Sequence, residues 1–247
     1  MKNAFLLPLL IHLVACQPGR APVPSVAEVP AAVARSGPSG AEMERHAIFA
    51  QAVRDAIMRA DLEHAQKEAR RLTDLPITLD AVEYAERFHL MEIAAGQVVA
   101  ATTIVRAAHA FGELTKACAT CHARLQGPTW VDVSGTAPGT VDSSWAMPRH
   151  AWAMTQMYNG VLYNSERPWQ AGAELLANRA AWADELPPRR LPSPRENALA
   201  TSMRELGLRA QSTSDGSLRA DLYGELLASC AGCHERTGGG PMERWHE

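Results

Sequence analysis

Apolar residues recur through most of this chain at the three- and four-residue spacing of α-helices, and neither half has the alternating β-branched runs typical of strands. In the first half, a helix is predicted from the apolar stripe Met43, His46, Ala50, Val53 and Ile57. Further helices are predicted from Leu62 to Leu75, from about Asp80 to Val99, and from about Thr103 to Leu125. Pro76 ends the second of these helices.

The second half has a similar pattern. Its helices are predicted from Met147 to Tyr163, from Glu166 to Asp184, from Ser193 to Gln211, and after the turn Ser212–Gly216 through Cys233. Pro187 and Pro188 separate the second from the third. Four helices with short connections favour antiparallel neighbours, so the sequence predicts an all-α fold of two tandem four-helix bundles.

Segments rich in Pro, Ala and Gly divide the chain into domains. Residues 17–40 lack the groups that build a core, and they are predicted to form a flexible tether. Residues 127–144 are rich in Gly-Pro and Pro-Gly turns and are predicted to be a linker. The two bundles are then expected at residues 41–126 and 145–240, with a tail at 241–247.

The two halves resemble each other in sequence. Met43–Ala47 (MERHA) near the start of the first half matches Met147–Ala151 (MPRHA) near the start of the second. Phe111–Leu114 (FGEL) and Tyr223–Leu226 (YGEL) each begin seven residues before a cysteine motif. An internal duplication accounts for these matches.

Each half ends in the pattern Cys-x-x-Cys-His, which is typical of covalent c-type haem. The two thiols add to the vinyl groups of the porphyrin, and the histidine binds the iron as the proximal ligand. A Cys-x-x-Cys pair alone also occurs in zinc sites and redox dithiols, but the histidine that follows it twice favours haem. We therefore expect two covalently bound haem c groups, held by Cys118, Cys121, His122, Cys230, Cys233 and His234.

A haem motif at the C-terminal end of the fourth helix resembles the class II c-type cytochromes, the cytochrome c-prime group. The residues that carry this resemblance are Phe111–Leu125 and Tyr223–Arg236, each a helix that runs into the motif. The resemblance implies a four-helix bundle with haem packed between its helices, and a role in electron transfer or small-gas binding. Many members of the group leave the distal face of the iron apolar and open.

The distal side of each iron has its own candidates. In an up-down-up-down bundle the start of the first helix and the end of the fourth lie at the same end. His122 is thus expected to face His46, and His234 to face His150, so we expect His46 and His150 as sixth iron ligands. Other interpretations stay open: these histidines could cap a helix, pack, or contact a haem propionate, Met43 or Met147 could bind the iron instead, or the face could be open. Met91, Met154, Met157 and Met203 are expected in the core.

The N-terminus indicates export. Lys2 precedes an apolar run from Ala4 to Ala15 that is too short to span a bilayer and is near the length of a signal core. Leu13–Cys16 resembles a bacterial lipobox, so residues 1–16 are expected to be a lipoprotein signal with Cys16 acylated; the alternative is an ordinary secretory signal. The motifs and Cys16 use all five cysteines. We expect a periplasm-facing protein with a lipid anchor in a bacterial membrane, and Gln17 favours the outer membrane.

Charge and side-chain chemistry narrow the function. A formal net charge of −3 without a basic cluster argues against nucleic acid as a partner. No acid–base pair or nucleophile triad stands out, so we do not expect an enzyme. The expected function is electron transfer between periplasmic donor and acceptor proteins by Fe(III)/Fe(II) cycling. The alternative is a haem peroxidase or a gas-binding protein with an open distal iron face, and a sensor is the weakest interpretation.

Overall fold

The structure is a computed structural model of the chain and describes residues 40–75, 82–125, 147–178 and 194–237. All of them belong to one compact unit, Ser36–Glu247. The expected signal segment with Cys16, the tether up to residue 39, the linker at 127–144 and the tail lie outside the described residues.

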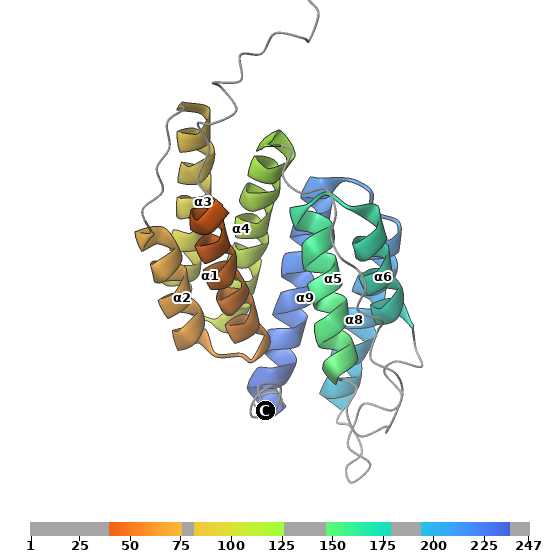
Figure 1. Cartoon of the computed structure of the whole chain (residues 1–247). Helices are drawn as coiled ribbons and strands as arrows, with labels where there is room; N and C mark the ends of the chain where they lie inside the picture. The colour runs from red at the N-terminus through yellow and green to blue at the C-terminus, as the bar shows by residue number, and fades with distance from the viewer. Residues whose placement is uncertain (1–39, 76–81, 126–146, 179–193, 238–247) are drawn as a thin grey trace, which may run out of the picture. The chain divides into compact units, whose positions relative to one another are not determined.

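The described residues form eight α-helices and no strand, which confirms the all-α prediction (Figure 1). The first half contains α1 (Gly40–Met58), α2 (Leu62–Asp74), α3 (Val82–Ala100) and α4 (Ile104–Leu125). The second half contains α5 (Met147–Leu162), α6 (Glu166–Ala177), α8 (Pro194–Gln211) and α9 (Gly216–Thr237). None of these helices is both long enough and apolar enough to cross a membrane.

Most predicted helix ends lie within a few residues of the observed ones, and α6 is the exception. A continuous helix from Glu166 to Asp184 was expected, but α6 ends at Ala177. Asn178 leaves the helix with an extended backbone (φ −75°, ψ 116°), and its N–H donates to the carbonyls of Glu174 and Leu175. The prediction was wrong here because the polar, alanine-rich sequence after Asn178 carries no strong stop signal before the two prolines.

The turns after α1 and α5 are built alike. Ala60 and Asn164 each lie fourteen residues after the repeat histidine, His46 or His150, and both have a positive φ, of 61° and 46°. After the first turn, the side chain of Asp61 caps α2 by accepting a hydrogen bond from the His64 N–H at 2.9 Å. The duplication in sequence is therefore also a duplication of local structure.

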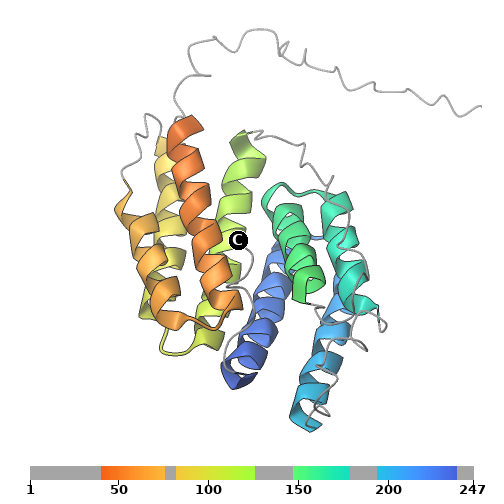
Figure 2. The ribbon, with the colours of Figure 1, turned by 60° about the horizontal axis from the view of Figure 1, so that its bottom comes forward.

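Within each half, helices that follow one another in sequence pack side by side: α1 on α2, α2 on α3 and α3 on α4, then α5 on α6, α6 on α8 and α8 on α9 (Figures 1 and 2). The most extensive contact in the described part of the chain is between α4 and α9, one helix from each half. Helix α9 also contacts α1, and α4 contacts α5. The last helices of the two halves thus form the centre of this unit.

Two glycines allow α4 and α9 to approach at backbone distance. A Cβ atom on Gly112 would lie 3.0 Å from the Ala220 carbonyl oxygen and 3.1 Å from the Gly224 Cα. One on Gly224 would lie 3.4 Å from the Gly112 Cα. The helices cross in antiparallel directions, since Lys116, one turn after Gly112, reaches Asp221, before Gly224, at 3.3 Å. The matching FGEL and YGEL segments are therefore the crossing point of the two halves.

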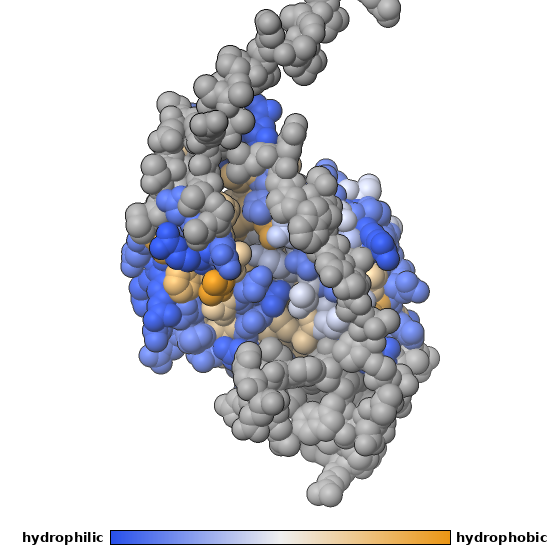
Figure 3. Space-filling view, viewed as in Figure 1, coloured by the Kyte–Doolittle hydropathy of each residue, from blue (hydrophilic) through white to orange (hydrophobic). Residues whose placement is uncertain are grey.

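One buried hydrophobic cluster includes side chains from both halves. Its largest members are fully buried: Ile57, Leu72, Phe111, Leu114, Met154, Met157, Trp169, Leu176, Tyr223, Leu226 and Leu227. The four methionines that were expected in the core are buried, with exposures of 8% for Met91, 4% for Met203 and 0% for both Met154 and Met157. That prediction is confirmed. The space-filling view shows a mostly hydrophilic outer face on the described helices, with scattered apolar residues (Figure 3).

Candidate functional site

Both Cys-x-x-Cys-His motifs lie in the last turns of the two central helices, the first in α4 and the second in α9. On a helix, residues three and four positions apart share a face, so each pair of cysteines and its histidine lie together. Among the described residues these four cysteines form no disulfide. Each motif thus places two thiols and an imidazole close together on its helix.

Burial keeps the first cysteine of each motif protonated. It raises the pKa of Cys118 to about 12, with a smaller contribution from the neighbouring Cys121. The pKa of Cys230 is likewise raised to about 12, first by burial and then by Cys233. Reactive redox dithiols have the opposite property, since their thiolates are stabilised by positive surroundings. This electrostatic environment therefore disfavours a thiol-redox function in the protein without a bound group.

The first motif lies at the end of the unit where α1 and α3 begin. Arg87 of α3 donates a hydrogen bond to the Thr120 carbonyl inside the motif, at 3.3 Å. His46 of α1 is 4% exposed, and its ring packs edge-on against Phe88 with centroids 5.4 Å apart. Neither ring nitrogen of His46 has a hydrogen-bond partner in the described structure. Burial, followed by the charge of Arg45, lowers the pKa of His46, so this imidazole is held neutral with both nitrogens unsatisfied.

His122, the histidine of the first motif, contacts the other half of the chain. Its ring packs edge-on against Tyr163, the residue after α5, with centroids 5.4 Å apart and planes at 70°. Its Nδ1 atom is buried and lacks a hydrogen-bond partner within the described residues. Burial lowers the pKa of His122.

His234, the histidine of the second motif, makes a hydrogen bond across the halves. Its Nδ1 pairs with the backbone carbonyl of Met58, the last residue of α1. A carbonyl only accepts, so Nδ1 carries the proton and Nε2 is the nitrogen with a lone pair. Metal-bound histidines in proteins commonly have this arrangement, with one nitrogen donating to a carbonyl and the other on the metal.

His150 lies close enough to His234 to affect it. Burial is the largest cause that lowers the pKa of His234; the bond to Met58 opposes this, and the charge of His150 adds to it. His150 is 6% exposed on α5. His150, the predicted distal ligand of the second site, thus lies near the histidine of that motif. No corresponding interaction of His122 is among the causes that shift the pKa of His46.

Contacts from the opposite half are the feature that sequence reasoning missed. Each motif histidine was expected to face the first helix of its own half. In the structure, the contacts of these histidines that are seen lie at the end of the first helix of the other half, His122 at Tyr163 and His234 at Met58. The glycines of the FGEL and YGEL segments were the available signal, because a helical glycine often marks a close approach of two backbones.

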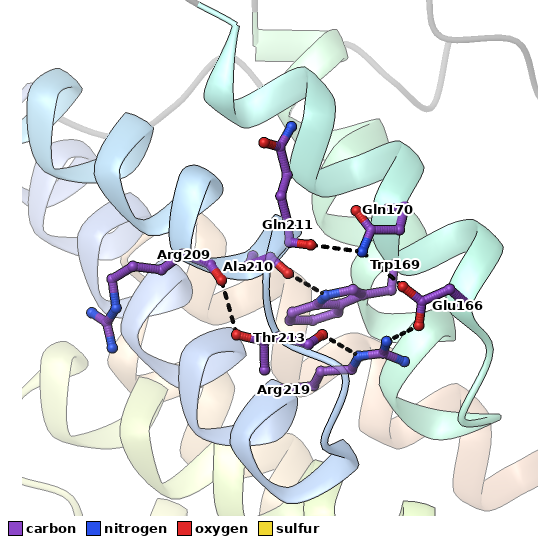
Figure 4. A network of polar contacts seen from close by, with 8 residues as sticks. All are labelled: Glu166, Trp169, Gln170, Arg209, Ala210, Gln211, Thr213 and Arg219. Carbon is purple, nitrogen blue, oxygen red and sulfur yellow. Dashed lines mark hydrogen bonds and ion pairs between the residues drawn. The ribbon is translucent and has the colours of Figure 1, made fainter.

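A buried arginine joins the start of α6, just after the α5–α6 turn, to the segment that precedes α9 (Figure 4). Arg219 of α9 is 1% exposed; its Nε donates to the Thr213 carbonyl at 3.0 Å, and its guanidinium also pairs with Glu166, the first residue of α6. Trp169 lies under the same guanidinium and donates from its indole to the Ala210 carbonyl at 2.8 Å.

The hydrogen bonds of this network change the pKa of the Glu166 carboxylate. Hydrogen bonds from Gln170 and then Arg219 lower its pKa. Gln170 also donates to the Gln211 carbonyl at 2.9 Å, so three elements are joined at one place. The turn that brings Tyr163 to His122 is thereby fixed by polar contacts as well as by packing.

Two groups of side chains on these helices remain: the alternative distal ligands Met43 and Met147, and glutamates and histidines without an assigned role. Met43 is half-buried, and the side chain of Met147 lies outside the described residues. Glu113 is exposed, and Glu225 pairs with Arg209 at 2.9 Å on the surface. His89 and His109 are exposed. In the described ranges, three or more His, Cys, Asp or Glu side chains nowhere gather into a group that could hold a metal ion.

The residues of the two motifs fit a covalently attached haem by their chemistry. Each site offers two thiols for thioether bonds and an imidazole, and the hydrogen bond from His234 Nδ1 to the Met58 carbonyl sets the tautomer that has its lone pair on Nε2. The buried, unsatisfied nitrogens of His46 are what a metal ligand would show in the absence of its metal. No protein-family model, no curated protein and no solved structure matches this chain.

Proposed function

We propose that this protein is a dihaem c-type cytochrome that transfers electrons between partner proteins. The observation that carries the proposal is the hydrogen bond from His234 Nδ1 to the Met58 carbonyl within a Cys-x-x-Cys-His motif. It sets the tautomer that leaves Nε2 for iron, and a carbonyl at this position makes the imidazole a stronger ligand. Haem bound in this way supplies one-electron Fe(III)/Fe(II) chemistry.

Each residue of the chain has a defined task in this proposal. Cys118 with Cys121, and Cys230 with Cys233, form the thioether bonds. His122 and His234 are the proximal ligands, and His46 and His150 the sixth ligands. Coordination of each iron on both sides would keep its geometry similar in both oxidation states, which favours rapid transfer.

The architecture and location are part of the same proposal. Each half is a four-helix unit like that of the class II c-type cytochromes, with the haem motif at the end of its last helix. The N-terminal segment directs export, and acylation of Cys16 holds the protein on a bacterial membrane facing the periplasm. Periplasmic electron donors and acceptors are then the partners.

The first test is the haem content of the protein, produced with a cytochrome c maturation system. A pyridine haemochrome assay should find two covalently bound haem c groups per chain. Cys118→Ala/Cys121→Ala and Cys230→Ala/Cys233→Ala should each retain one. Protein that folds without covalent haem would refute the proposal.

The second test is an optical spectrum of the oxidised and dithionite-reduced protein, with and without carbon monoxide. Two six-coordinate irons should give low-spin spectra that carbon monoxide leaves unchanged. His46→Ala and His150→Ala should each open one site to carbon monoxide, whereas His109→Ala, an exposed histidine on α4, should open neither. High-spin bands and a carbon monoxide shift in the unmodified protein would instead support gas binding or peroxide chemistry.

A further inference from the structure

A buried cluster of one arginine and three aromatic side chains lies between the two haem motifs. Arg54 of α1 is 8% exposed, and its guanidinium lies 5.3 Å from the ring centre of Tyr158 on α5. Tyr158 packs against Tyr223 of α9 with ring centres 5.9 Å apart, and against Phe111 of α4 at 6.1 Å. Four helices, two from each half, therefore contribute to this cluster.

The cluster consists of two pairs of repeat-related positions. Arg54 and Tyr158 each lie eight residues after their repeat histidine, and Phe111 and Tyr223 each lie seven residues before the first cysteine of a motif. The duplication thus brings matching positions face to face at the crossing of α4 and α9. Both pairs differ in residue type, and only the first half contributes a cation, Arg54.

Both haem motifs border this cluster, because Cys118 and Cys230 pack against the buried core that contains its three aromatic side chains. The pKa of Tyr158 is raised first by burial and then by its interaction with Cys118 of the first motif. Tyr223 is likewise buried, and Cys230 of the second motif is among the groups that raise its pKa. The first cysteine of each motif therefore interacts with one of the two tyrosines, whose ring planes are tilted by 40°.

The charge of Arg54 is only partly compensated. Its partner is the adjacent Asp55, with Nε to Oδ1 at 2.8 Å, and that carboxylate is 35% exposed while the arginine side chain is 10% exposed. Burial by itself lowers the pKa of Arg54, but attraction to Tyr223, Asp55 and Tyr158 outweighs it, so the guanidinium stays charged. A solvated counter-charge is screened more strongly than a buried one.

We infer that Arg54 is a shared potential-setting residue, which raises the reduction potentials of both haem groups from its position between them. The inference rests on the proposed function. Reduction adds one negative charge to each site, and a buried cation that both sites sense favours the reduced form of each. A residue that only packed the core would leave the two potentials unchanged.

Potentiometric titration of the full-length, haem-loaded protein tests this role. Arg54→Met keeps an unbranched side chain and removes the charge, so both midpoint potentials should shift downward. Arg54→Lys keeps the charge and should retain most of the original values. Arg209→Met removes an exposed arginine of α8 and should shift neither midpoint.

A second variant tests the same charge in the opposite direction. Asp55→Asn removes the partly exposed counter-charge without emptying the core, and both midpoints should rise. Thermal unfolding confirms that each variant is folded, and Asp55→Asn decides the matter if Arg54→Met does not fold. Unchanged midpoints, or a shift at one haem alone, would overturn the shared role. The absence of covalent haem from the unmodified protein would instead refute the proposed function.

Discussion

At the residue scale, the two motif histidines differ although their motifs match. His234 donates its Nδ1 proton to the carbonyl of Met58, whereas the buried Nδ1 of His122 has no such partner in the described structure and its ring packs on Tyr163. A hydrogen bond of this kind raises the basicity of the imidazole. A more basic ligand stabilises Fe(III) over Fe(II).

For the proposed dihaem protein, we therefore expect the haem at the His234 site to have the lower midpoint potential. A net hydrogen-bond contribution of about 1 kcal/mol corresponds to ~40 mV for a one-electron couple. The measurement compares two single-haem proteins by redox titration: Cys118→Ala/Cys121→Ala, which keeps the His234 site, and Cys230→Ala/Cys233→Ala, which keeps the His122 site. Equal potentials, or the reverse order, would show that this hydrogen bond does not set the difference.

At the element scale, the crossing of α4 and α9 depends on residues without side chains. Gly112 has backbone atoms of α9 within 3.0–3.1 Å of the position that a Cβ would occupy, whereas Gly96 of α3 has nothing within 4 Å. Both glycines are in helices, so alanine increases the helix propensity of both alike. Only their surroundings differ.

Gly112→Ala is expected to destabilise the fold by about 1–3 kcal/mol, because backbone atoms cannot rotate away from the new methyl group and the two helices must separate. Gly96→Ala should be neutral or stabilising by up to ~1 kcal/mol. Urea unfolding followed by circular dichroism gives both values. If Gly112→Ala were as stable as Gly96→Ala, the close approach of α4 and α9 would be in error.

At the scale of the whole molecule, the two halves contribute side chains to one hydrophobic cluster. The most extensive helix–helix contact of the described residues, between α4 and α9, also joins the two halves. Leu114 of α4 and Leu226 of α9 are both nearly or fully buried, and helices of each half pack on those of the other. Domains with so much common core unfold together. The tryptophans of the described residues, Trp152 and Trp169, are both in the second half and report on it selectively.

Unfolding of the two halves should accordingly coincide. With Trp130, Trp145, Trp182 and Trp245 replaced by Phe, thermal transitions followed by tryptophan fluorescence and by far-ultraviolet circular dichroism should have one midpoint. Leu114→Ala in the first half should lower both by a destabilisation of about 2–5 kcal/mol. Ile48→Ala, at a side chain that is 55% exposed on α1, is the control and should change little. If Leu114→Ala left the midpoint of the fluorescence transition unchanged, the two halves would unfold independently.

Local patterns in the sequence were enough for the helices and for the residue types of the site. Helical spacing of apolar residues and the positions of proline predicted nearly every described helix, and the four methionines expected in the core are buried. These features depend on residues only three or four positions apart, so they are visible in the sequence itself. The end of α6 at Asn178 was missed because no glycine or proline marks it.

The pairing of the two halves was decided by tertiary structure alone. The repeat was visible in the sequence, but nothing in its periodicity states that Gly112 meets Gly224, that Met58 reaches His234, or that Tyr163 covers His122. In the sequence, Arg54 is an ordinary charged residue of an amphipathic helix. Only the tertiary structure shows that side chains of α5 and α9 surround it. Helix periodicity specifies which face of a helix is buried, whereas the partner of that face depends on shape and close packing between residues far apart in the chain.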